Sequence, residues 1–95
     1  MSLDKRFEKY GFVKVREDTH GVTYKKEETL YGYFACLDIM HKQSGRHLLH
    51  SYDTKVIRNA DGKKNEYFNP ANGIEIRMLP LIFAKYIYMK LKYKW

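Results

Sequence analysis

Cysteine is almost absent from this chain of 95 residues, since Cys36 is the single one. One cysteine excludes an intramolecular disulfide and a cysteine-based zinc site within one chain, and it fits a reducing cytoplasm. Long hydrophobic runs are also missing, because no stretch approaches about 18 uninterrupted apolar residues and no signal-peptide run opens the chain. We therefore expect a cytoplasmic protein with no membrane segment.

The composition is that of a folded, basic domain. Eighteen Lys and Arg against eleven Asp and Glu give a net charge of +7, which favours acidic partners such as nucleic acid without selecting among them. The hydrophobic fraction of 44% is too high for a disordered chain, and the length leaves room for one core. We expect residues 1–95 to form a single domain, in which Met1 to Leu3 resemble a cloning-vector leader.

Hydrophobic periodicity predicts helices at both ends of the chain and strands between them. The expected elements are helices over 2–10 and 78–94 and strands over 13–16, 22–26, 30–41 and 46–52. The segment 53–73 is rich in turn-forming residues and is expected to be irregular, with a short strand near 55–58. The predicted fold is α+β: an antiparallel meander of about four strands, with a short N-terminal helix and a long C-terminal helix packed on one face.

The register of the central hairpin stays open at this level. The strand 30–41 is apolar on both faces and should be central, and residues 46–52 should return beside it. A slip of one residue decides whether His50 opposes Asp38 or Leu37, because neighbouring strand residues point to opposite faces.

The C-terminal helix is apolar on two sides, with lysines between them. One arc holds Met78, Leu79, Ile82, Tyr86, Met89 and Tyr93, and the other holds Leu81, Ala84, Ile87, Tyr88, Leu91 and Trp95. A sheet covers only the first arc, so the second must be covered by the opening helix, by a second copy of the chain or by another partner. The predicted partner interface is Leu81, Ile87, Tyr88, Leu91 and Trp95.

Two further chemistries compete with protein association. His41, His47 and His50 with Asp38 are the residue types of a zinc site, but ordinary sheet histidines explain them as well, and Cys36 reads as a small buried residue rather than a nucleophile. The terminal lysines alternate with aromatic residues, which combines phosphate contacts with stacking surfaces. That alternative, a sequence-tolerant nucleic-acid binder, would use Lys85, Lys90, Lys92 and Lys94.

The run CLDIMHKQSGRHLLHSY, from Cys36 to Tyr52, resembles small uncharacterised proteins encoded by phages and prophages of Gram-positive bacteria. The shared feature is a KxSGxHL hairpin, here Lys42 to Leu48. The resemblance implies a mobile-element origin and brings no activity or site residue with it. The sequence as a whole predicts a non-enzymatic accessory protein without cofactor, metal or small-molecule substrate, which associates with itself or another protein through its C-terminal helix.

Overall fold

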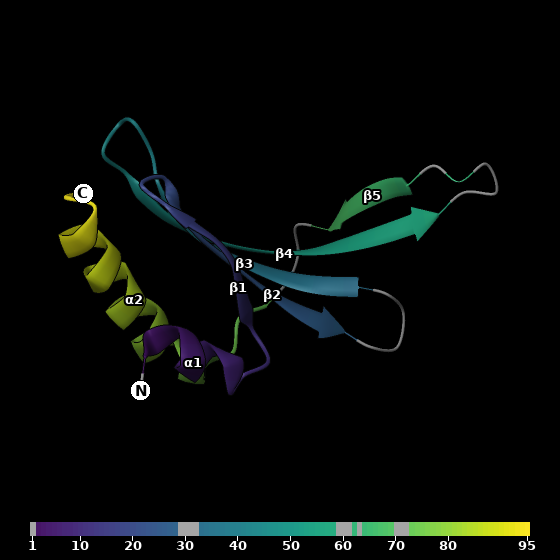
Figure 1. Ribbon diagram of the computed structural model, residues 1–95, viewed down its shortest axis with the longest axis horizontal. Helices are drawn as coiled ribbons and strands as arrows, with labels where there is room; N and C mark the ends of the chain where they lie inside the picture. The colour runs from purple at the N-terminus through teal and green to yellow at the C-terminus, as the bar shows by residue number, and fades with distance from the viewer. Residues whose placement is uncertain (1, 29–32, 59–61, 63, 70–72) are drawn as a thin grey trace.

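In the computed structural model, the described residues form one antiparallel sheet with two helices on one of its faces (Figure 1). The structure describes residues 2–28, 33–58, 62, 64–69 and 73–95. In chain order the elements are α1 (Leu3–Glu8), β1 (Val13–Asp18), β2 (Gly21–Glu28), β3 (Tyr33–His41), β4 (His47–Arg58), β5 (Lys64–Asn69), the 3-10 turn η1 (Ile76–Met78) and α2 (Leu79–Lys92). The strands lie side by side in sequence order. The predicted α+β meander is confirmed.

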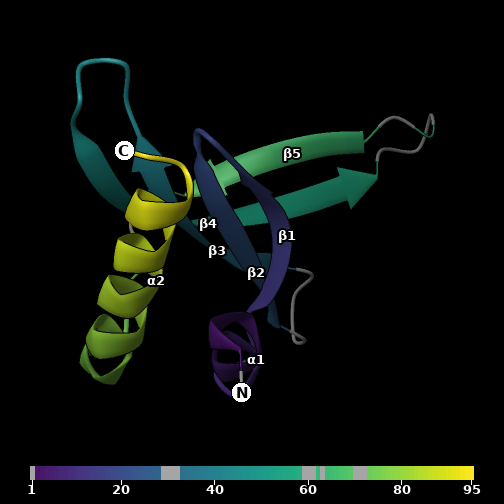
Figure 2. The ribbon, with the colours of Figure 1, turned by 60° about the vertical axis from the view of Figure 1, so that its left-hand side comes forward.

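The core lies between the helices and the face of the sheet that they cover, here called the inner face (Figure 2). Alternation along β2 and β3 sends every second side chain to this face. The rings of Phe7 from α1 and Tyr24 from β2 stack with their centroids 4.0 Å apart. The buried cluster comprises Phe7, Val22, Tyr24, Leu37, Ile39, Met78, Ile82 and Met89. The helical arc predicted to cover the sheet therefore supplies three core residues, Met78 from η1 and Ile82 and Met89 from α2.

A β-bulge changes which side chains of β1 face the helices. Lys14 pairs with Tyr24 and Arg16 pairs with Thr23, so Val15 is an extra residue between two successive pairs. The extra residue changes the alternation, and both Lys14 and Glu17 then contact α1 and α2 residues on the inner face. Val13 and Val15 are about half exposed, at 53% and 54%. This edge strand thus presents polar side chains to the helices.

The pairing of β3 with β4 settles the register in favour of Asp38 opposite His50. The strand expected at 46–52 and the short strand expected near 55–58 are one element, because β4 continues to Arg58. The expectation of an irregular segment is wrong for residues 64–69, which form β5 against β4. Pairing with a long partner strand overrides the turn preference of Asn65 and Asn69.

The last residues fold back onto the sheet instead of extending α2 to residue 94. Lys94 takes a left-handed conformation, with φ of 55°, and the Trp95 amide donates to the Lys90 carbonyl at 3.1 Å. The Trp95 indole then donates from Nε1 to the Thr19 carbonyl at 2.9 Å. In the described residues, no helix has the length and apolar character needed to cross a membrane.

Candidate functional site

An apolar ridge runs along the outer side of α2. It consists of four residues at i, i+4 spacing, which places them on one stripe of the helix. Their exposed fractions are 46% for Leu79, 64% for Phe83, 40% for Ile87 and 77% for Leu91. We call these four residues the α2 ridge. The ridge exists because Ile82, Lys85 and Met89 occupy the opposite stripe, which is buried against the sheet and α1.

An apolar groove lies next to the ridge, between α2 and the sheet. Its volume is about 710 Å³, and its walls include Leu79, Pro80 and Phe83 from α2 and Ile39 and Leu49 from β3 and β4. Leu79 and Phe83 belong to both the ridge and the groove. A convex and a concave apolar surface therefore lie side by side on one face of the molecule.

The predicted interface residues divide into two groups. Ile87, Tyr88 and Leu91 are exposed, as an interface in a free protomer would be. Leu81 is partly buried and faces a hollow shared with α1, while Trp95 packs on the β3–β4 hairpin. Including Trp95 in an outward arc is wrong, because the left-handed residue before it breaks the helical phase. The opening helix thus covers only the Leu81 side of the second arc.

Phe83 is the main residue that the sequence interpretation misses. It belongs to neither predicted arc, yet its exposed fraction is among the largest of the apolar side chains on α2. Leu79 belongs to the arc predicted to cover the sheet but is nearly half exposed. The signal for both is the repeat of apolar residues every four positions from Leu79 to Leu91.

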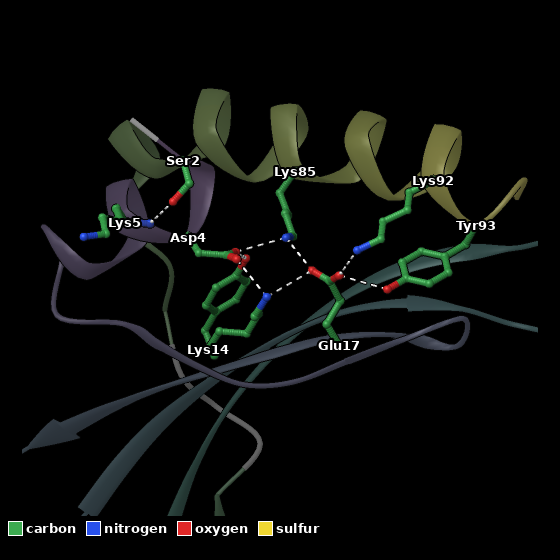
Figure 3. Close-up of polar contacts among 9 residues, drawn as sticks. Ser2, Asp4, Lys5, Lys14, Glu17, Lys85, Lys92 and Tyr93 are labelled. Carbon is green, nitrogen blue, oxygen red and sulfur yellow. Dashed lines mark hydrogen bonds and ion pairs between the residues drawn. The ribbon is translucent and has the colours of Figure 1, made fainter.

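Lys85 is buried at the centre of a polar cluster that joins both helices to β1 (Figure 3). Its side chain is only 2% exposed, and Nζ lies 3.0 Å from Oδ1 of Asp4 and 2.6 Å from Oε1 of Glu17. The Tyr24 hydroxyl donates to the same Asp4 oxygen at 2.6 Å. Lys85 therefore lies inside the protein and not at a solvated border of α2, because two carboxylates compensate its charge there.

Glu17 accepts contacts from four side chains of this cluster, Lys14, Lys85, Lys92 and Tyr93. Its second oxygen, Oε2, accepts from Lys92 Nζ at 2.9 Å and from the Tyr93 hydroxyl at 2.8 Å. Lys14 completes the cluster from β1, with Nζ 2.8 Å from Asp4 Oδ2. The bulge at Val15 is what brings Glu17 to the inner face, so a backbone irregularity makes the cluster possible.

The cluster controls the ionisation of its two acids. Burial opposes ionisation of Glu17, but hydrogen bonds from Lys85, Lys92 and Tyr93 outweigh it and lower the pKa from 4.5 to about 2. A similar balance lowers the pKa of Asp4 from 3.8 to about 2. Both carboxyl groups therefore hold protons less tightly in the folded state than in the unfolded state.

This difference predicts acid-sensitive stability. A depressed folded-state pKa stabilises the protein fully above pH of about 4.5, and the stabilisation disappears as the pH falls toward 2. Urea unfolding at a series of pH values should show this loss, and Glu17→Gln should be less stable at pH 7 with a shallower acid dependence. Glu75→Gln, an exposed control, should keep the wild-type profile. An unchanged profile in Glu17→Gln would contradict the role of the cluster.

The four lysines of the nucleic-acid alternative do not form one surface. Lys85 is buried, and Lys92 is bound to Glu17. Lys90 and Lys94 are exposed and have no ion pair among the described residues. Two of the four lysines predicted to contact phosphates, Lys85 and Lys92, are therefore already bound to Glu17.

The candidate metal ligands lie on opposite faces of the sheet. His41 and His47 pair across β3 and β4, and the Trp95 ring stacks on His41 with a centroid separation of 5.1 Å. Asp38 and His50 form another pair, displaced by an odd number of residues, and so point to the outer face. In the described part of the chain, no three side chains of metal-binding type are grouped around one point.

Cys36 is a buried residue on the outer face of the sheet. Its side chain is buried, and Sγ lies 3.8 Å from Oγ1 of Thr54. Burial raises the pKa of the thiol above its ordinary value of 9.0. A protonated, inaccessible thiol is a poor nucleophile at neutral pH.

Comparisons of the chain with protein-family models, with curated proteins and with solved structures gave no match. The resemblance of the hairpin to phage and prophage proteins stays a prediction. The α2 ridge and the groove beside it share Leu79 and Phe83 and form one apolar surface among the described residues.

Proposed function

We propose that this protein is a non-enzymatic association domain that forms a homodimer through α2. The observation that carries the proposal is the α2 ridge, in which four large apolar side chains at i, i+4 spacing are 40% to 77% exposed. Exposed apolar surface of this continuity is typical of protein interfaces. No enzymatic role is proposed, because neither Cys36 nor the divided histidines supply a catalytic arrangement.

The ridge offers enough surface for a small dimer interface. If a large side chain contributes about 200 Å², the exposed parts of the four residues amount to roughly 450 Å². Two copies would bury about 900 Å² from the ridges alone, close to the roughly 1,000 Å² that a specific interface needs. The groove walls, including Leu49 at 43% exposure, would add to this area.

The adjacent ridge and groove favour a second copy as the occupant. A twofold interface requires one surface that is complementary to itself, and this face contains both a projection and a hollow. In an antiparallel pair of α2 helices, Leu91 of one protomer would approach Leu79 and the groove of its partner. The same antiparallel arrangement separates Lys90 and Lys94 from the same lysines of the partner. This separation matters because α2 contains no acidic residue that could offset their charge.

Light scattering coupled to size exclusion tests the proposal. We expect a molar mass of twice 11.4 kDa at high protein concentration, and Leu91→Glu or Phe83→Glu should give the monomer because each buries a charge in the interface. Val13→Glu places the same charge on a half-exposed apolar residue far from the ridge and should leave the dimer intact. A wild-type monomer at every concentration would overturn the proposal, even if the ridge then proved to bind a different protein.

A further inference from the structure

We propose that a basic hollow between α1 and the start of α2 binds the phosphate backbone of a nucleic acid. The hollow has a volume of about 580 Å³, and it is lined by three cations, Arg6, Lys9 and Arg77, together with Tyr10. Pro80, Leu81 and Ala84 from α2 complete its lining. No acidic side chain is among the described residues that line it. This site is separate from the ridge and uses none of the four terminal lysines.

The guanidinium group of Arg77 can bind an anion through its two terminal NH₂ groups. Its Nε donates to Oε2 of Glu75 at 2.7 Å, and its guanidinium lies 5.2 Å from the centre of the Tyr10 ring. These two contacts orient the group and leave both terminal NH₂ groups without an acceptor among the described residues. A planar guanidinium with two parallel N–H donors matches a phosphate group in bidentate geometry.

Arg6 and Lys9 supply charge that the protein does not neutralise. Both are exposed, on the face of α1 that borders the hollow, and neither has an ion pair among the described residues. The lysines of the interior, in contrast, are matched by Asp4 and Glu17. Two cations without a partner among the described residues, Arg6 and Lys9, therefore lie at this hollow beside Arg77, which is paired with Glu75.

The openness of the site favours a polyanion over a single free phosphate. A site for one phosphate converges its donors on an enclosed point, whereas these cations lie around a wide hollow between two helices. Successive phosphates of a nucleic-acid strand can be contacted by cations spread in this way. The contacts reach the backbone alone, so binding should not depend on base sequence.

Fluorescence anisotropy with a labelled single-stranded oligonucleotide tests the site. Each cation removed should cost one phosphate contact, so Arg6→Ala with Lys9→Ala should weaken binding at least about 10-fold at low salt. The slope of log affinity against log salt should become shallower by about 1.4. Arg77→Lys keeps the charge but loses the bidentate geometry and should weaken binding several-fold. The double variant Lys42→Ala with Arg46→Ala, in the β3–β4 turn, removes the same charge elsewhere and should bind almost as the wild type.

Each other outcome counts against the site. Equal losses in the turn variant would show that net charge alone determines binding. Loss of binding in Lys90→Ala with Lys94→Ala, but not in the α1 variant, would place the contact on the terminal lysines. Binding to vesicles of anionic phospholipid without binding to the oligonucleotide would identify a membrane surface instead. The measurements repeated on the Leu91→Glu protein separate this proposal from dimer formation.

Discussion

Replacing Lys85 with methionine is expected to lower the free energy of unfolding by about 3 kcal/mol. The substitution removes the cation that lies between Asp4 and Glu17, and leaves two carboxylates facing each other in a partly buried site. The expected loss is at the lower end of the range for broken buried pairs, because Lys14 and Lys92 still contact these acids. Methionine nearly fills the space of the lysine stem, so a packing defect contributes little.

Urea unfolding at neutral pH measures this effect, and α2 provides the matched control. Lys90→Met makes the same substitution on the exposed side of the helix and should change stability by less than about 0.5 kcal/mol. The double variant Lys85→Met with Glu17→Gln should recover part of the loss, since one uncompensated charge is removed. Equal stability of the Lys85→Met and Lys90→Met proteins would mean that the cluster does not stabilise the fold.

Gly21→Ala is expected to destabilise the protein by at least about 3 kcal/mol. An added Cβ would overlap the carbonyl oxygen of Ile39, a backbone atom that cannot move without disturbing the β2–β3 pairing. Gly21 also has φ of 149°, a conformation that residues with a side chain rarely adopt. The first residue of β2 thus has to be glycine so that β3 can approach closely.

Gly45→Ala is the control that separates the two causes. Gly45 also has a positive φ, 84°, but a Cβ added there would have no neighbouring atom within 4 Å, so only the conformational cost of about 1 kcal/mol should remain. Thermal unfolding of both variants would compare them directly. Similar losses at Gly21 and Gly45 would contradict the steric argument.

The polar cluster and the α2 ridge are connected through the orientation of α2. Lys85 points inward because Asp4 and Glu17 receive it, and this contact fixes the rotation of the helix about its axis. With Lys85 inward, Phe83 and Ile87 must point outward. A helix rotated to bury the ridge would instead leave both acids without their central partner.

Local residue patterns are sufficient to predict the fold class and both helices, but not β5. Alternation in β2 and β3, the helical spacing around Phe7 and the position of Pro80 at the start of α2 are short-range signals, so a single sequence contains them. The double apolar character of α2 is equally visible in the sequence, and it leads to the proposed association surface. Ile87 and Leu91 lie on the uncovered side, as the pattern predicts.

Only the tertiary structure decided how the polar residues are used. Glu17 and Lys85 are 68 positions apart, and their contact depends on a bulge at Val15 that the alternation of valines conceals. The return of Trp95 onto the hairpin likewise depends on the backbone conformation of the preceding lysine. Periodicity records which residues share a face of one element. The rotation of a helix against a sheet, and therefore the choice between a buried lysine and an exposed one, is set by charges that meet only when the chain is folded.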